Sequence, residues 1–117
     1  MYKGEMMDIV ESGREKNAVV LSVKGRMDAT AAPVFDKHLA GLMDGGDMIY
    51  ILDLEGLEYI SSAGVRSILV LAKNLKNRGG KFFLAAATPP VMKVFKMSGF
   101  EAIIPIRESV ASAMDQL

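Results

Sequence analysis

The 117-residue sequence contains no cysteine, no tryptophan and only one histidine. Without cysteine the chain forms neither disulfides nor thiolate sites, a composition that fits a reducing compartment. Lysine plus arginine and aspartate plus glutamate each total 14, so the formal net charge is zero, and like charges form no long block. Because nucleic-acid binding requires a concentrated basic surface, we expect no nucleic-acid partner.

Long hydrophobic runs are also missing from the chain. No stretch approaches the ~20 apolar residues that span a bilayer, and Lys3, Glu5 and Asp8 interrupt the N-terminal segment too early for a signal peptide. We therefore expect a cytoplasmic protein without direct membrane insertion. Hydrophobic residues nonetheless make up 50% of the chain, which at this length predicts a single domain, residues 1–117, with one core.

The residues that usually perform catalysis or bind metals are scarce. His38 lies between apolar positions of a predicted helix, where packing is favoured over a role as ligand or base, so we expect no metal site and no cofactor. The segment 60–64 is similar to the G-x-S-x-G turn of hydrolases, but Ile60 replaces the first glycine. A serine hydrolase would also need His38 to reach Ser62 from another helix. We expect no enzyme, and a hydrolase is the weakest alternative.

The densest group of cations lies where a predicted helix ends, at Lys73, Lys76, Arg78 and Lys81. Cations near a helix C-terminus complement the negative end of its dipole. This structural role is favoured over recognition of a polyanion.

Strand-like and helix-like periods alternate along the chain. Alternating apolar residues at 19–24 predict a strand with one buried face, formed by Val19, Leu21 and Val23. Nearly continuous apolar runs at 48–54 and 81–87 predict strands covered on both faces. Further strand candidates are a weaker one at 5–11 and one at 103–106, where Pro105 indicates an edge strand.

Four stretches have helical spacing and recognisable ends. Asp28 and Thr30 are candidate caps of the first helix, and Pro33 suits its first turn. Strands interleaved with helices predict an α/β fold, with a small mixed, largely parallel sheet covered by about four helices. We expect the first helix to end at the glycines 45–46 and the second to run from about Ala63 to Asn77. The third should start at Thr88 and end at Ser98–Gly99, and Ser109 should cap the last.

Two adjacent hydroxyls, Ser61 and Ser62, end an apolar segment and open the second predicted helix. The first N–H groups of a helix lack intrahelical acceptors and the dipole is positive there, so an oxygen or a phosphate on Ser62 is electrostatically favoured. Ser62 is therefore a simple N-cap, a chemical switch, or both. For Asp28 the sequence alone favours a turn or capping role over a functional one.

The order of these motifs resembles the STAS domains of anti-sigma factor antagonists over nearly the whole chain. Gly25 and Asp28 are similar to the glycine-x-x-aspartate turn that follows the second strand of that family. The other matching segments are Asp53–Leu54, Tyr59–Ile60, Ser61–Gly64, Arg78–Gly80 and Met97–Phe100.

The resemblance implies a protein that switches partners without catalysing a reaction itself. In this family the unmodified antagonist binds an anti-sigma factor that is also a serine kinase, which frees the sigma factor. The kinase then phosphorylates the antagonist, and a serine phosphatase resets it. Matched motif by motif, Ser62 is the phosphoacceptor and Asp28 lies on the neighbouring loop. Sporulation-type members have aspartate where this chain has Ser61, which leaves the identity of the kinase open and makes Ser61 a second candidate acceptor.

Helix spacing, taken with the resemblance, predicts a contact surface. We expect a buried stripe on this helix, at Val65, Ile68, Leu69, Ala72 and Leu75. Counting about 100° per residue from it places four residues on the opposite, wet side: Ala63, Ser67, Val70 and Asn74. The expected partner-binding residues are Asp28, Ser61, Ser62, Ala63, Arg66, Ser67 and Val70.

A second function is compatible with the same resemblance. A STAS subunit can act without phosphorylation as an adaptor in a membrane-associated complex, for instance one for lipid transport. Phosphate incorporation at Ser62 separates the two functions.

Overall fold

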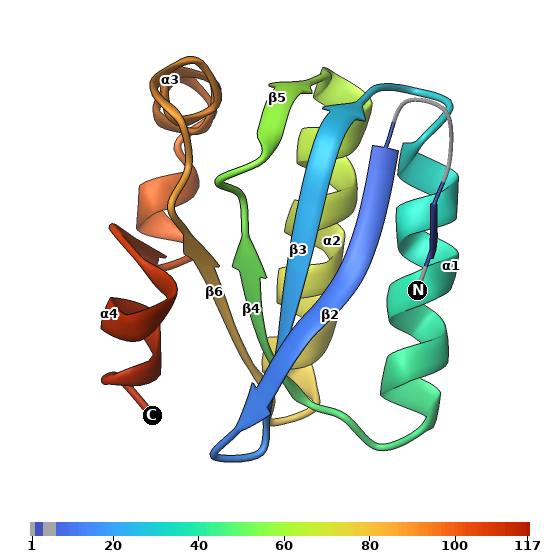
Figure 1. The fold of residues 1–117 in the computed structure, drawn as a ribbon, viewed down its shortest axis with the longest axis vertical. Helices are drawn as coiled ribbons and strands as arrows, with labels where there is room; N and C mark the ends of the chain where they lie inside the picture. The colour runs from blue at the N-terminus through green and yellow to red at the C-terminus, as the bar shows by residue number, and fades with distance from the viewer. Residues whose placement is uncertain (1, 4–6) are drawn as a thin grey trace.

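Apolar runs form the strands of one mixed sheet in the computed structural model, which describes residues 2–3 and 7–117 (Figure 1). The strands are β1 (Tyr2–Lys3), β2 (Met7–Glu15), β3 (Ala18–Met27), β4 (Ile49–Asp53), β5 (Leu57–Ile60), β6 (Lys81–Ala85) and β7 (Ile106–Arg107). They lie in the order β1-β2-β3-β4-β6-β7, with β5 also paired to β3. The first three strands are antiparallel and the remaining pairs are parallel, which confirms the predicted α/β fold.

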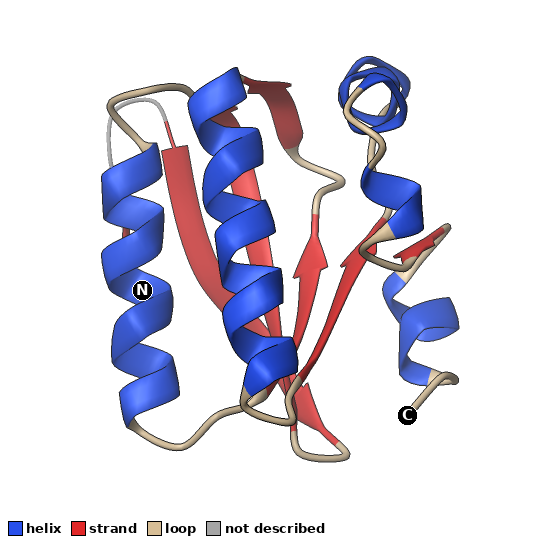
Figure 2. Ribbon diagram, turned by 180° about the vertical axis from the view of Figure 1, so that it is seen from behind, coloured by secondary structure: helices blue, strands red, loops and turns tan. Residues whose placement is uncertain are grey.

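Helices cover both faces of this sheet. They are α1 (Ala32–Asp44), α2 (Ser62–Asn77), α3 (Pro89–Met97) and α4 (Val110–Met114), with a 3-10 turn at Phe100–Ala102. Helices α1 and α2 lie side by side on one face (Figure 2). The opposite face carries α4, which contacts β4, β6 and β7.

The core consists of two apolar clusters separated by the sheet. The larger contains Val19, Leu21 and Val23 of β3 and lies beneath α1 and α2. Ala18 and Val20 point the other way, into the smaller cluster with Ala113 and Met114 of α4. The prediction of one buried face for this strand is therefore wrong, because a helix from the far end of the chain covers its second face.

Several predicted element ends shift in the structure. In the segment 103–106 only Ile106 joins β7, while Ile103 is 50% exposed and Pro105 offers its carbonyl to the N–H of Leu84. This strand lies at the sheet edge, as Pro105 indicated. The candidate strand at 5–11 is β2, which runs from residue 7 to 15, and residues 4–6 lie outside the described part.

Strand β3 is long enough to pair twice, and this positions the start of α2. Its residues Ala18–Ser22 pair with β4, and Gly25–Met27 pair with β5. The chain leaves β4, returns to the sheet beside the end of β3, and turns directly into α2. The loops that follow β3 and β5 therefore meet at one end of the sheet.

Candidate functional site

Backbone hydrogen bonds fasten the start of α2 to the end of β3. The N–H of Ser61 donates to the carbonyl of Met27 over 2.9 Å, and the Ser61 hydroxyl donates to the same oxygen over 3.2 Å. Met27 and Ile60 are paired residues of β3 and β5. The structure thus brings Asp28, which follows Met27, next to the two serines.

Ser61 is the N-cap of α2. Its backbone is extended, with φ −86° and ψ 170°, and its Oγ accepts a hydrogen bond from the N–H of Gly64 over 3.2 Å. The prediction that Ser62 caps this helix is therefore wrong by one residue. With both of its hydrogen bonds made and its side chain partly buried, Ser61 performs a structural task.

Ser62 is the first residue of α2, and its side chain is exposed to solvent. Among the described residues its hydroxyl makes no hydrogen bond, and the cap that satisfies the N–H of Gly64 comes from Ser61. Arg66, four residues further on and also exposed, lies one turn along the helix. A negative group on Ser62 would stand at the positive end of a 16-residue helix dipole.

Asp28 organises the loop between β3 and α1. Its Oδ1 accepts from the hydroxyl of Thr30 over 2.7 Å and from the N–H groups of Thr30 and Ala31, each over 3.0 Å. The Thr30 hydroxyl and these N–H groups hold the pKa of the Asp28 carboxyl below its usual range. Asp28 and Thr30 are not the N-cap of α1, which is Ala31, whereas Pro33 occupies the first turn as predicted.

A groove between α1 and α2 adjoins Ser62. It has a volume of about 270 Å³, and its lining residues are Ala29, Ala32, Pro33, Asp36, Ala63, Arg66, Ser67 and Val70. Val70 is 48% exposed, in agreement with the expected wet face. Ser67 is buried, contrary to prediction, because α1 packs against that side of α2. Leu71 is buried too, whereas Val65 and Leu69 are only partly buried.

Sequence reasoning missed one pair beside the site. The Arg26 guanidinium lies 4.1 Å from the centre of the Tyr59 ring, and Tyr59 is 39% exposed. Strand pairing brings these residues opposite one another, next to the pair Met27 and Ile60. An arginine and an exposed tyrosine flanking the two motifs were visible in the sequence, but the pairing of β3 with β5 was not.

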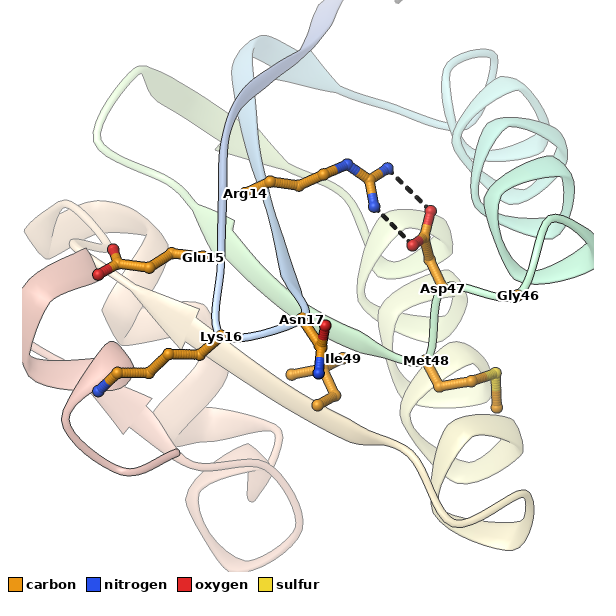
Figure 3. Close-up of a pocket in the computed structure, with 8 residues that line it drawn as sticks. All are labelled: Arg14, Glu15, Lys16, Asn17, Gly46, Asp47, Met48 and Ile49. Atoms are coloured by element: carbon orange, nitrogen blue, oxygen red, sulfur yellow. Dashed lines mark hydrogen bonds and ion pairs between the residues drawn. The ribbon is translucent and has the colours of Figure 1, made fainter.

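A polar hollow at the opposite end of the sheet is a second candidate. Figure 3 shows Arg14 of β2 reaching across to the carboxylate of Asp47, which it pairs with over 2.6 and 2.9 Å. Glu11 accepts further hydrogen bonds from the same guanidinium. Arg14 and Asp47, two of the charged residues that line this hollow, are therefore paired with one another, and we interpret the pair as a clasp between β2 and the loop before β4.

The structure offers no assembled metal site within residues 7–117. No group of three or more histidine, cysteine, aspartate or glutamate side chains converges there. His38 lies partly buried in α1, and burial lowers its pKa. Ser62 is at the N-terminus of α2, and no described residue donates a hydrogen bond to its hydroxyl or accepts one from it.

The family model described as the STAS domain matches residues 10–113. The chain belongs to the STAS domain family. It is 37% identical over 98 residues to BtrV of Bordetella bronchiseptica, an alignment that covers 81% of this chain and 84% of BtrV. BtrV is named as an anti-sigma factor antagonist.

Solved structures of STAS domains share the fold. A crystal structure from Thermotoga maritima, described as an anti-sigma factor antagonist, matches with a TM-score of 0.86 at 21% identity, over 96% of this chain and 94% of that one. The Bacillus protein SpoIIAA matches in its unphosphorylated form with a TM-score of 0.76 at 24% identity, over 94% of both chains. Its phosphorylated form matches with 0.70 at 22%, over 94% and 97%.

Further relatives are named as antagonists of anti-sigma factors F and B, so the chain lies among the anti-sigma factor antagonists of the STAS family. Within the described residues no helix is long and apolar enough to cross a membrane.

Proposed function

We propose that this chain binds an anti-sigma factor that is also a serine kinase, and that phosphorylation of Ser62 by that kinase releases it. The observation that carries the proposal is the division of labour between adjacent serines. Ser61 caps α2, so the exposed hydroxyl of Ser62 can accept a phosphoryl group without removing a hydrogen bond on which the helix depends.

A phosphate on Ser62 is compatible with the folded chain. It adds roughly −1.5 to −2 charges at a helix N-terminus, where negative charge is favourable, and Arg66 lies one turn away. Most of the energetic cost therefore falls on a complex in which the partner closes over Ser62. When the partner supplies no counter-charge of its own for the phosphate, burying the charge costs about 3–5 kcal/mol, which weakens binding roughly a hundred- to several-thousand-fold.

The groove between α1 and α2 is the proposed contact for the partner. Ala63, Arg66 and Val70 line it beside Ser62, and apolar groups of the partner can displace water from its small-residue floor. Asp28 orders the loop that follows β3, whose Ala29 also lines the groove, and Tyr59 with Arg26 extends the surface. Tyrosine and arginine are the residue types that most often carry binding energy at interfaces.

Ser61 and Ser67 support this surface indirectly, by holding α2 in place. Ser61 fixes the first turn through its cap, and Ser67 lies in the packed contact between the two helices. Phosphorylation of Ser61 would require breaking its hydrogen bonds to Gly64 and Met27, which favours Ser62 as acceptor. A serine phosphatase that removes the phosphate would restore the binding-competent form. SpoIIAA, which shares the fold, exists in both forms.

The test is phosphoryl transfer from the cognate switch kinase and ATP, read by mass spectrometry as an added phosphate. We expect phosphate on Ser62 in the natural chain and in Ser61→Ala, and none in Ser62→Ala. Pulldown of the kinase with Ser62→Asp should lose binding that the unmodified protein shows. Phosphate on Ser61 alone would overturn the residue assignment, and no phosphate despite stable binding would favour an adaptor role.

A further inference from the structure

A second groove lies at the other end of α2, between that helix and the segment leading to β7. It has a volume of about 250 Å³, and its apolar lining comes from Ala72, Phe82, Phe83, Ile103, Ile104 and Pro105. Ile103 is 50% exposed at the rim, while Phe82 and Ile104 are buried beneath it. The groove is therefore concave, with an apolar floor and one large apolar side chain open to solvent.

Three exposed lysines surround this apolar floor. Lys73 and Lys76 project from α2 three residues apart, which places them on one face, and Lys81 opens β6. Within residues 7–117 the described ion pairs involve Arg14 with Glu11 and Asp47, so no carboxylate pairs with these lysines. The helix dipole accounts for Lys76 in the last turn, but not for Lys81 on a strand.

We propose that this groove binds an acidic segment of a protein partner, with one apolar side chain of the segment in the groove and its carboxylates against Lys73, Lys76 and Lys81. The charge pattern selects an acidic partner, since the chain as a whole is neutral but this rim is purely cationic. The concave apolar floor favours a protein segment, which can present an apolar side chain between carboxylates, over a nucleic acid, whose exposed surface is mainly phosphate and sugar.

The groove operates independently of Ser62. Residues 62 and 76 are separated by about 20 Å along the helix, at 1.5 Å per residue, and charges are screened over about 8 Å at physiological ionic strength. A phosphate at one end of α2 therefore leaves the lysines at the other end unaffected. The two grooves share no lining residue, so we expect the acidic segment to bind whether or not Ser62 carries a phosphate.

The experiment titrates the isotope-labelled protein with a short synthetic peptide in which a leucine pair is flanked by glutamates. We expect saturable amide shift changes centred on residues 72–83 and 103–105, with affinity falling as salt is raised. The matched peptide with serines in place of the leucines should bind at least fivefold more weakly. The same titration of Ser62→Asp should give an unchanged affinity.

Variants of the rim test the assignment. Charge reversal in the combined variant Lys73→Glu, Lys76→Glu and Lys81→Glu should weaken peptide binding about tenfold or more, and Ile103→Asp should do so alone. All four positions are exposed, so the fold should be retained, as circular dichroism can verify. Lys37→Glu, an exposed lysine on α1, is the matched control and should bind normally.

Four outcomes would overturn the proposal. The first is the absence of saturable binding by the leucine peptide, and the second is equal affinity in the charge-reversed protein. The third is a set of shift changes centred on the groove next to Ser62. Binding to vesicles of anionic lipid without binding of the peptide would likewise exclude an acidic protein segment as the occupant.

Discussion

Ser61 and Ser62 are chemically identical neighbours, and only backbone conformation separates their roles. Ser61 is extended, which turns its Oγ toward the N–H of Gly64, whereas Ser62 already belongs to the helix and points its hydroxyl outward. A capping oxygen stabilises a helix by satisfying a donor that no intrahelical carbonyl reaches. The stability of the domain should therefore depend on the first serine and its regulation on the second.

We predict that Ser61→Ala lowers the free energy of unfolding by about 1 kcal/mol, the typical value for loss of an N-cap. Ser62→Ala should change it by less than about 0.5 kcal/mol, as is usual for exposed positions. Urea denaturation of the two variants measures both values, and each variant serves as the control for the other. An equal loss in Ser62→Ala would show that the second hydroxyl also supports the helix.

Asp28 allows charge and hydrogen bonding to be separated at one position. In Asp28→Asn an amide oxygen still accepts from Thr30 and Ala31, whereas in Asp28→Ala this acceptor is lost. We predict that the alanine variant unfolds at lower temperature and binds the anti-sigma factor more weakly, and that the asparagine variant stays closer to the natural protein in both. Calorimetry and titration of the partner give the comparison.

The contrary result would be that both Asp28 variants bind the partner equally weakly, although only the alanine variant is less stable. The carboxylate charge itself would then contact the partner, instead of positioning the loop.

The junction between β3 and α2 is the element on which the site depends. Gly64 lies in the first turn of α2, and a Cβ at this position would stand 2.8 Å from Ile60 Cγ1 and 2.9 Å from the Met27 carbonyl oxygen. Because one of these neighbours is backbone, a side chain cannot be accommodated by a rotamer change alone. Glycine at this point of the Ser61–Gly64 motif thus permits the helix to start directly against the strand.

We predict that Gly64→Ala lowers the free energy of unfolding by about 1–3 kcal/mol, the usual cost of overpacking. The displaced first turn should also slow phosphorylation of Ser62, since the hydroxyl moves with it. Gly41→Ala in α1 is the matched control, because a Cβ there meets nothing within 4 Å. Denaturant unfolding and the rate of phosphate incorporation should both distinguish the two variants. If Gly64→Ala and Gly41→Ala had the same stability and the same phosphorylation rate, steric contact at Gly64 would be excluded as the explanation.

Element types were predictable from the sequence because each run carries its own period and ends. The apolar run of β4 and the helical spacing of α2 up to Asn77 are local signals, and the structure confirms them. The errors concern contacts between distant segments. Burial of the second face of β3 depends on α4, and burial of Ser67 depends on where α1 packs, neither of which a local period encodes.

At the candidate site, too, local features were predictable from the sequence, whereas contacts between distant segments were not. The motif around Ser62 was readable because a serine pair before a helix has a local physical meaning. Which serine caps was decided by the pairing of Ile60 with Met27, and the Arg26–Tyr59 contact by the pairing of the same strands. Sequence thus identified the segment, and the sheet register determined the task of each residue within it.

At the scale of the molecule, the two ends of the sheet have different tasks. One end carries Ser62, Asp28 and the groove between α1 and α2, while the other is fastened by Arg14 and Asp47. The backbone carbonyl of Asp47 also accepts from the hydroxyl of the buried Tyr50, and burial raises the pKa of Tyr50 to about 12. Arg14 and Tyr50 therefore both hold the loop before β4, at the end of the sheet opposite Ser62.

This clasp makes a pH-dependent contribution whose sign follows from Asp47. Its hydrogen bonds to the Arg14 guanidinium lower the pKa of the Asp47 carboxyl in the folded state. The stabilisation is present above the unfolded pKa, near 3.9, and is lost as pH falls through the lower folded value. Because both side chains are solvent-screened, the contribution should be small.

We predict that Asp47→Asn lowers the urea midpoint at pH 7 and that the difference from the natural protein narrows as pH falls below about 4. Glu108→Gln, which removes an exposed carboxylate elsewhere, should show no such convergence. Phosphorylation of Ser62 at pH 7 should proceed at the natural rate in Asp47→Asn, because the clasp lies at the opposite end of the sheet. A slower rate would mean that the two ends are coupled through β3 and β4, and a difference that grows in acid would assign the ion pair the wrong sign.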